Sequence, residues 1–298
     1  MLNMTINRKK LVQKHNPVKT STEPYAPFTV GNGSIAFTAD VTGLQTLYEE
    51  QVQAGVPLLT MADWGWHTAL PKSGLPYTLE QVVMTEYPYS GRTVRYAVEK
   101  KPGNEEIYDW VRQNPHRYNL IRIGLIYNGE YINSNQLSDM HQELDLYTGI
   151  LHSSFKLEGK QVKLQTVCHG EEDVLGFKIV SEECANRNLQ VKLELPYGSS
   201  EMSGADWNGE DKHTTEVLKN DSGYLHLAHR MDNDICFISV SGEHGLEYDR
   251  CARHGFVCKS AKQEVSLTVE LSEAEIHGYT EYSYEVCEKA SRKHWQSF

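Results

Sequence analysis

The sequence lacks the long apolar runs and the catalytic signatures that identify many protein classes directly. No apolar run approaches the roughly 18 residues that a membrane-spanning helix needs. The basic first 18 residues contain no apolar segment of the signal-peptide kind, so no signal peptide is visible and the compartment stays open. The patterns GxSxG, GxxxxGK[ST], GxGxxG and HExxH are missing, which argues against serine-hydrolase, phosphate-loop and zinc-protease chemistry.

Basic residues are also few. The 298 residues include 29 Lys and Arg against 40 Asp and Glu, which gives a formal net charge of −11. This charge argues against nucleic acid and anionic membrane surfaces as partners, because both attract basic patches. The six cysteines are scattered without a CxxC pair, which favours buried free thiols over disulfides. We therefore predict no metal site and no cofactor.

Short apolar or alternating segments separated by turn residues dominate the chain and predict an all-β fold. The clearest hairpin is SSFKLEGKQVKLQTV, in which Gly159 can take the positive φ of a tight turn. The run NLQVKLELPY alternates strictly, as expected of a strand with one wet face. The predicted strands cover residues 28–41, 120–127, 149–157, 161–169, 174–181, 189–196, 224–230, 235–241, 255–259 and 264–271.

Helical patterns are sparse. Residues 43–53 and 105–113 predict short helices, and residues 279–298 predict a longer one, with Ser272 and Glu275 as a capping box before it. The polar segment 197–219 and the stretches 55–88 and 96–117 are too long for hairpin turns. Because Trp295 and Phe298 end the last helix, we expect residues 1–272 to form a sandwich domain and residues 273–298 a linker helix. The alternative is an aromatic tail that docks back on the sandwich.

The most informative segment is ADWGWH, residues 62–67. Trp64 and Trp66 lie two apart, so in an extended backbone they would point the same way and offer apolar faces to sugar rings, with Asp63 and His67 bonding hydroxyls at the rim. The alternative is a buried aromatic plug. Asn32, between two glycines, could present its amide from a tight turn, although a purely structural turn is the alternative.

Several segments carry a resemblance: HNP at residues 15–17, APFTVGNGSIAFTADVTGLQT at 26–46, PLLTMADWGWH at 57–67, NLIRIGL at 119–125 and LDLYTGILHSSFKLEGKQVKLQTVCH at 144–169. Together they resemble the N-terminal region of bacterial six-hairpin glycosidase-like proteins, similar to the class of maltose and kojibiose phosphorylases. The resemblance implies a large antiparallel β-sandwich, a supersandwich of the galactose mutarotase kind. In that class a linker helix and an (α/α)6 barrel follow, and the barrel carries the acid and base residues.

The resemblance therefore implies that this chain holds no catalytic residues and that the barrel of the same parent chain is its partner. Carbohydrate is the implied ligand, with the loops GNGSIAF and ADWGWH at the rim and Arg122 pairing with a carboxylate. The substrate-binding candidates are Asn32, Asp63, Trp64, Trp66, His67 and Arg122. Whether the parent hydrolyses or phosphorolyses a glycoside, and which sugar it takes, stays open.

Two further functions stay open. A free-standing carbohydrate-binding module would need Trp64, Trp66 or Trp207 as a solvent-facing platform. A mutarotase-like aldose epimerase would need a histidine and a carboxylate converging on one sheet face, for which His152 and His169 are the candidates. Turnover of glycosides, binding of glycans and mutarotation of free sugars distinguish the three functions.

Overall fold

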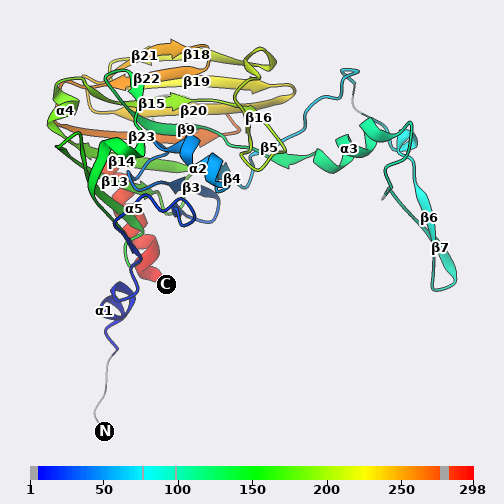
Figure 1. Ribbon diagram of the computed structural model, residues 1–298, viewed down its shortest axis with the longest axis horizontal. Coiled ribbons are helices and arrows are strands. Elements are labelled where there is room, and N and C mark those ends of the chain that lie inside the picture. The colour runs from blue at the N-terminus through cyan, green and yellow to red at the C-terminus, as the bar shows by residue number, and fades with distance from the viewer. Residues whose placement is uncertain (1–5, 76, 98, 276–281) are drawn as a thin grey trace, which may run out of the picture.

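The computed structural model describes residues 6–75, 77–97, 99–275 and 282–298 (Figure 1). Strands hold 44% of the chain and helices 17%. Two antiparallel sheets, one of nine strands and one of five, make up most of the described fold. The predicted all-β antiparallel sandwich with a C-terminal helix is therefore confirmed.

The elements are as follows. The nine-stranded sheet contains, in spatial order, β1 (Val18–Lys19), β11 (Leu137–Asp145), β12 (Ile150–Leu157), β13 (Lys160–Cys168), β14 (Val174–Val180), β23 (Glu264–Ser272), β20 (Asp234–Gly242), β19 (Tyr224–Met231) and β18 (His213–Asp221). The five-stranded sheet contains β10 (Glu130–Tyr131), β9 (Arg122–Tyr127), β15 (Leu189–Glu194), β22 (Gly255–Lys259) and β21 (Glu247–Ala252). The smaller ladders join β2 (Phe28–Gly31), β3 (Ile35–Ala39) and β4 (Thr60–Ala62); β5 (Trp66–His67) and β8 (His116–Arg117); β6 (Thr85–Tyr89) and β7 (Arg92–Tyr96); and β16 (Tyr197–Gly198) and β17 (Ala205–Asp206). The α-helices are α1 (Arg8–Gln13), α2 (Tyr48–Ala54), α3 (Glu105–Gln113), α4 (Glu182–Ala185) and α5 (Tyr284–Ser297).

The two sheets enclose one apolar core, because alternate residues of both sheets point inward. The core cluster joins Leu151 and Phe155 of β12 to Ile123 of β9, Leu193 of β15 and Phe256 of β22. Each such fully buried side chain contributes about 1.5–3 kcal/mol relative to exposure. The alternating apolar side chains of β15 therefore pack the smaller sheet against the larger one.

The segment predicted as one strand, residues 28–41, is a hairpin of β2 and β3. Gly33 turns the chain with a φ of +101°, a value that side chains rarely adopt. The Asn32 side chain closes the turn by accepting hydrogen bonds from the next backbone amides. Asn32 and Gly33 therefore form the tight turn expected of them, and this turn divides the predicted strand into two.

Several strands were not predicted from the sequence, and the longest of these are β11, β18 and β21. β18 and β21 are edge strands of the two sheets, and most of their side chains are exposed. An edge strand with few inward-facing residues shows no apolar alternation, so its sequence reads as a polar loop. The excursion predicted for residues 197–219 therefore ends at His213, where β18 begins.

The C-terminal helix α5 packs on the outer face of the larger sheet. Tyr284 and Cys287 bury their side chains against Ile150, Val167 and Val174 of β12, β13 and β14. The helix is capped by Ser283 rather than by Ser272, which belongs to β23. The first predicted helical residues, 279–281, lie outside the described residues.

The end of α5 is only partly covered. A Cβ atom placed on Gly149 would lie 2.1 Å from Cδ1 of Trp295, so this glycine leaves the space that the indole occupies. Trp295 nevertheless stays 37% exposed and Phe298 stays 71% exposed. The aromatic tail therefore docks on the sandwich through one residue and presents the other to solvent. The division at residue 272 stays a prediction.

Residues 68–115 leave the sandwich as an extended arm (Figure 1). The arm contains β6, β7 and α3, and it is rooted where β5 pairs with β8. None of its described residues belongs to either apolar core cluster. Six of its large apolar side chains are exposed: Leu75, Leu79, Val83, Tyr89, Tyr96 and Val111. An isolated two-stranded hairpin is marginally stable in water, so the arm depends on contacts beyond the core of the sandwich.

Replacing residues 71–113 with a short Gly-Ser linker is expected to leave the sandwich folded. The arm adds nothing to the core, so the midpoint of thermal unfolding should change by less than about 4 °C, equivalent to roughly 1 kcal/mol. The linker keeps Ala69 and Asn114, whose backbone and side chain form a 2.9 Å hydrogen bond at the root. Calorimetry of the two proteins makes the comparison. Phe37→Ala, which opens the core, is the destabilised reference, and a deletion as damaging as that variant would contradict the prediction.

Candidate functional site

Asn32 uses its side-chain amide inside the fold. Its Oδ1 accepts hydrogen bonds of 2.9 Å from the backbone amides of Ser34 and Ile35. Its Nδ2 donates to the backbone carbonyls of His169, at 3.1 Å, and Glu172, at 3.0 Å. The side-chain amide that was expected to face a sugar thus connects the β2–β3 turn to the loop after β13. These hydrogen bonds agree with the alternative, a purely structural turn.

Asp63 and Trp64 follow β4 in a turn. Asp63 is exposed, and its Oδ1 accepts a 3.0 Å hydrogen bond from Oγ of Ser34. Trp64 is half-buried against the core, and its Nε1 donates to Oδ2 of Asp173 at 2.6 Å. The indole of Trp64 therefore fixes this turn to the loop before β14.

Trp66 is the indole of this segment that reaches the surface, with 46% of the residue exposed. Its Nε1 donates to the backbone carbonyl of Asp63 at 3.0 Å. The guanidinium of Arg117 lies 4.7 Å from the ring centroid and also donates to the carbonyl of Ala62. Asp63, Trp66 and Arg117 together are called the Trp66 surface below.

The two indoles do not form the paired platform that an extended backbone predicts. The backbone turns between them, because Gly65 N donates to the Ala62 carbonyl and Trp66 N to the Trp64 carbonyl. Trp64 bonds to Asp173, whereas Trp66 stacks with Arg117. The turn places one indole partly within the fold and leaves the other accessible to a ligand.

His67 does not lie at the rim, because its side chain is fully buried. Its Nδ1 lies 2.8 Å from Oδ2 of Asp234, and its Nε2 lies 3.4 Å from Oδ2 of Asp232. The edges of Tyr118 and Tyr197 pack against the ring. The predicted contact of His67 with sugar hydroxyls is corrected: both ring nitrogens face the β19–β20 turn, and the residue holds β5 in place beneath the Trp66 surface.

Arg122 lies elsewhere, at the start of β9, and only 4% of the residue is exposed. Its guanidinium donates to the backbone carbonyls of Gln45, at 3.3 Å, and Thr46, at 3.4 Å. The rings of Tyr48 and Tyr131 each lie 4.7 Å from the guanidinium carbon. Hydrogen bonds and two aromatic faces therefore hold the cation in a single position.

Two carboxylates accompany Arg122. Glu49 lies 3.3 Å and Glu194 lies 3.5 Å from Nη1 of the guanidinium. These groups line a cavity of about 200 Å³, and none of the other five predicted site residues lines it. The tertiary structure thus separates the predicted residues into the Trp66 surface with its supports and the cavity of Arg122.

Three histidines cluster at this cavity, and two of them, His213 and His254, line it. Nδ1 of His213 lies 2.7 Å from Nε2 of His229, and the rings of His213 and His254 stack with centroids 3.6 Å apart. Burial lowers the pKa of His213 to about 4, and burial together with the neighbouring rings lowers the pKa of His229 well below its ordinary value. Burial also lowers the pKa of His254. The cluster is therefore neutral at pH 7.

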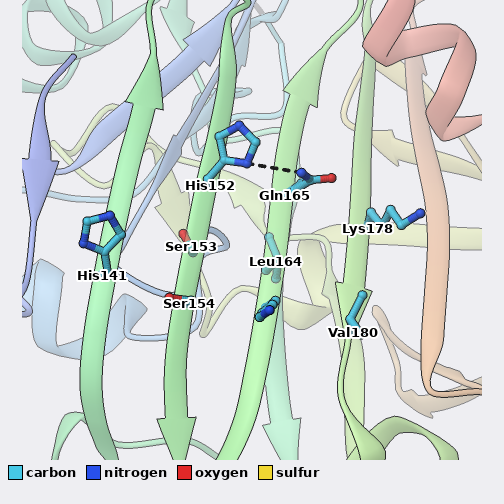
Figure 2. A pocket seen from close by; sticks show the side chains of 9 residues that line it. His141, His152, Ser153, Ser154, Leu164, Gln165, Lys178 and Val180 are labelled. Atoms are coloured by element: carbon cyan, nitrogen blue, oxygen red, sulfur yellow. Dashed lines mark hydrogen bonds between the residues drawn. The ribbon is translucent and has the colours of Figure 1, made fainter. Parts of the chain in front are cut away.

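A larger groove of about 330 Å³ lies on the outer face of β11, β12, β13 and β14 (Figure 2). His141, His152, Lys163 and Lys178 line it, and Nδ1 of His152 lies 3.2 Å from Nε2 of Gln165. Burial lowers the pKa of His152, and Lys178 forms an ion pair with Glu264 on β23. The groove is therefore less basic than its side chains suggest.

His169, the other histidine considered for epimerase chemistry, lies outside this groove. Its Nδ1 accepts hydrogen bonds from the backbone amides of Glu171, at 3.2 Å, and Glu172, at 2.9 Å. Burial lowers its pKa. Because its Nδ1 closes a turn and its ring lines no cavity with His152, the geometry offers no acid–base pair built on these two residues.

Among the described residues, no group of three or more His, Cys, Asp or Glu side chains could hold a metal ion. No helix in the same part of the chain is long and apolar enough to cross a membrane. The six cysteines are free, and Cys251 is exposed whereas the other five are buried. Burial raises the pKa of Cys258 and Cys236 to about 12, which keeps both thiols protonated.

Some residues of these sites have no local signal in the sequence. Arg117 reaches Trp66 only because β8 pairs with β5 about fifty residues earlier in the chain. Asp173, which accepts the Trp64 hydrogen bond, lies in a loop that reads as an ordinary acidic turn. Trp207, noted as a contact residue in a polar excursion, lines the Arg122 cavity.

The fold matches a solved structure titled "Putative kojibiose phosphorylase from human microbiome", with a TM-score of 0.53 and 13% identity over 95% of this chain and 38% of that chain. Two other solved structures are a glycoside hydrolase of family 81 from Clostridium thermocellum, with a TM-score of 0.34, 8% identity and coverage of 84% and 23%, and a GH36 α-galactosidase from Geobacillus stearothermophilus, with a TM-score of 0.24, 11% identity and coverage of 83% and 40%. No family model and no curated protein matches the sequence.

At these identities the first likeness establishes the fold alone, and the other two are too distant to carry an argument. The match accounts for nearly all of this chain and less than half of the other. The 298 residues therefore have the fold of one part of a longer chain.

Proposed function

We propose that this chain is the non-catalytic sandwich domain of a larger glycoside-processing enzyme, a hydrolase or a phosphorylase. The observation that carries the proposal is the fold match, which covers 95% of this chain and 38% of the chain titled as a kojibiose phosphorylase. The sandwich packs on an (α/α)6 barrel of the same parent chain, and the barrel supplies the reacting acid and base. Carbohydrate is the ligand of the assembled enzyme.

The Trp66 surface is the part of the sandwich that meets the sugar in this proposal. An exposed indole stacks on the apolar face of a sugar ring, and a neighbouring carboxylate and guanidinium bond its hydroxyls. Asp63, Trp66 and Arg117 offer these groups side by side, because Trp66 contacts both other residues. The hydrogen bond between His67 and Asp234 and the bond from Trp64 to Asp173 hold that surface rigid.

The arm supports the proposal of a partner domain. Its exposed side chains include Leu79, Tyr89 and Tyr96, which are costly to leave in water and favourable to bury at an interface. The arm is rooted at β5 and β8, beside the Trp66 surface. A partner that covers the arm would therefore also border that surface.

The purified chain is expected to release no sugar from kojibiose, maltose or trehalose, with or without inorganic phosphate. The carboxylate of Asp63 and those of Glu49, Glu194 and Asp206 are engaged in hydrogen bonds or ion pairs, and in this proposal the reacting acid and base belong to the barrel. Chromatographic detection of glucose and glucose phosphate after long incubation makes the measurement. Sustained release that tracks the purified protein would overturn the proposal.

A free-standing carbohydrate-binding module is the second function, favoured by the exposure of Trp66. It predicts saturable binding of oligosaccharides by this chain alone, lost in Trp66→Ala and kept in Trp295→Ala. The domain of a larger enzyme needs its partner to complete that site, so titration of oligosaccharides onto the Trp66 surface separates the two functions.

A further inference from the structure

The Arg122 cavity has no part in the proposed function, and its construction is that of a binding site. It has a volume of about 200 Å³ and lies where α2, β9, β10, β15 and β22 meet the loop between β17 and β18. No residue of the Trp66 surface lines it. The two places on the molecule are therefore independent.

One wall of the cavity is rigid because it is built around a buried cation. Arg122 is held by two backbone carbonyls and lies between the rings of Tyr48 and Tyr131. Oη of Tyr131 donates to Oε1 of Glu194 at 2.5 Å, and Nζ of Lys192 lies 3.0 Å from the same oxygen. Burial raises the pKa of Tyr131, so its hydroxyl stays protonated and keeps its bond to Glu194, which leaves the phenol oxygen to act as an acceptor.

The facing wall carries an indole and a carboxylate. Nε1 of Trp207 donates to Oη of Tyr48 at 3.1 Å, and the two rings meet edge to face with centroids 5.5 Å apart. Oδ2 of Asp206 accepts a 2.7 Å bond from Nζ of Lys212, which lowers the pKa of Asp206 and keeps it ionised. Trp207 stays half-buried, so part of its ring remains accessible.

The charges select the kind of ligand. Four carboxylates and one permanent cation line the cavity, which disfavours phosphate and other anions. Three of the four carboxylates already pair with Arg122, Lys192 or Lys212, and the fourth, Glu210, is exposed to solvent, which weakens the attraction of the cavity for an amine. A paired carboxylate still has lone pairs that accept hydrogen bonds from neutral hydroxyls.

We propose that this cavity binds a single neutral sugar ring, with its hydroxyls on Asp206, Glu194 and Tyr131 and its apolar face against Trp207. The choice of a saccharide over another neutral polyol rests on the proposed function, whereas the site itself rests on the contacts above. The volume admits one ring, so the ligand is a monosaccharide or the terminal residue of a longer glycan.

The test is titration of the full chain with glucose, galactose and mannose, followed by intrinsic tryptophan fluorescence and by calorimetry. Glucuronate and glucosamine are the charged comparisons. We expect saturable binding of at least one neutral hexose, and a rise in Kd of about tenfold or more in both Trp207→Ala and Asp206→Asn. Trp66→Ala, on the other surface, is the matched control and should leave this Kd unchanged. The fluorescence change should vanish with Trp207.

Several results would overturn the inference. They are the absence of saturable binding for every neutral hexose, an unchanged Kd in Asp206→Asn, or tighter binding of glucuronate or glucosamine than of any neutral sugar. Asp206→Asn is nearly isosteric, so it decides the matter even where Trp207→Ala weakens folding. Glycoside turnover by the chain would contradict the proposed function but would not affect the inference that the cavity binds a hexose. Likewise, a failure of hexose binding would not affect the conclusion of the turnover assay.

Discussion

Lowering the pH from 7 to 5 is expected to reduce the free energy of unfolding by about 2 kcal/mol through His213, and to reduce it further through His229. Nδ1 of His213 lies 2.7 Å from Nε2 of His229, inside the fold and away from solvent. Burial and the adjacent imidazoles lower the pKa of both residues. Protonating either ring would place a cation beside a second imidazole in a desolvated site.

The sign follows from proton binding. Below pH 6.5 the unfolded chain binds protons on these histidines, whereas in the folded chain His213 does so only near pH 4. The unfolded state therefore gains stability as the pH falls through this window, and the stabilising contribution of the neutral cluster is fully present only above about pH 6.5. Asp40 acts in the opposite direction, because burial raises its pKa.

Urea unfolding at pH 7, 6 and 5 measures this dependence, and variants isolate the histidines from Asp40. His213→Asn should reduce the slope of stability against pH by about 1.4 kcal/mol per pH unit between pH 6 and 5, and His229→Gln should reduce the slope in the same direction. Substitution of the exposed His244 should leave the slope unchanged. The absolute stability of the buried variants will differ from that of the parent, so only the slope is compared. Parallel curves for all four proteins would show that the cluster does not govern acid stability.

Replacing Arg122 with Met is expected to cost about 3–5 kcal/mol of stability, because it leaves buried polar partners without their cation. The backbone carbonyls of Gln45 and Thr46 lose their donor, and Glu194 loses an ion pair at a partly buried position. The stacking of the cation between Tyr48 and Tyr131 is lost as well.

Arg187 provides the matched control. It forms two 3.0 Å bonds to Glu247, a better ion-pair geometry than that of Arg122, but both partners are largely exposed. Exposed pairs contribute little, so Arg187→Met should cost less than about 1 kcal/mol. Urea unfolding of both variants at pH 7 makes the measurement. Equal losses of stability in the two variants would mean that burial does not determine how much the Arg122 ion pair contributes to the free energy of unfolding.

Most of the sandwich could be predicted because its strands have one buried and one wet face. Leu189, Val191 and Leu193 alternate with polar residues, and all three are buried in the core as the period of two requires. β18 and β21 could not be found in this way, because edge strands bury few side chains and carry no such period. Residues 28–41 were predicted as one strand although the turn residues Gly31, Asn32 and Gly33 lie within them, because strand residues occur on both sides of the turn.

The candidate site was predictable only in part. One indole of ADWGWH reaches the surface, and the composition of the segment could not say which of the two does so. That depends on the turn at Gly65 and on Asp173 and Arg117, which come from other elements. His67 looked like a rim residue, but the β19–β20 turn brings Asp232 and Asp234 over it and buries its ring.

Local patterns of apolar and polar residues thus settle the class of fold, since alternation is a property of neighbouring residues along one strand. The amino-acid composition also determines directly that the chain is acidic and contains many aromatic residues. The division of the predicted site into an exposed Trp66 surface and a separate Arg122 cavity depends on contacts between segments far apart in sequence, such as β5 with β8 and α2 with β9. Such pairings are chosen by how whole sheets pack, and no short window of sequence contains that information.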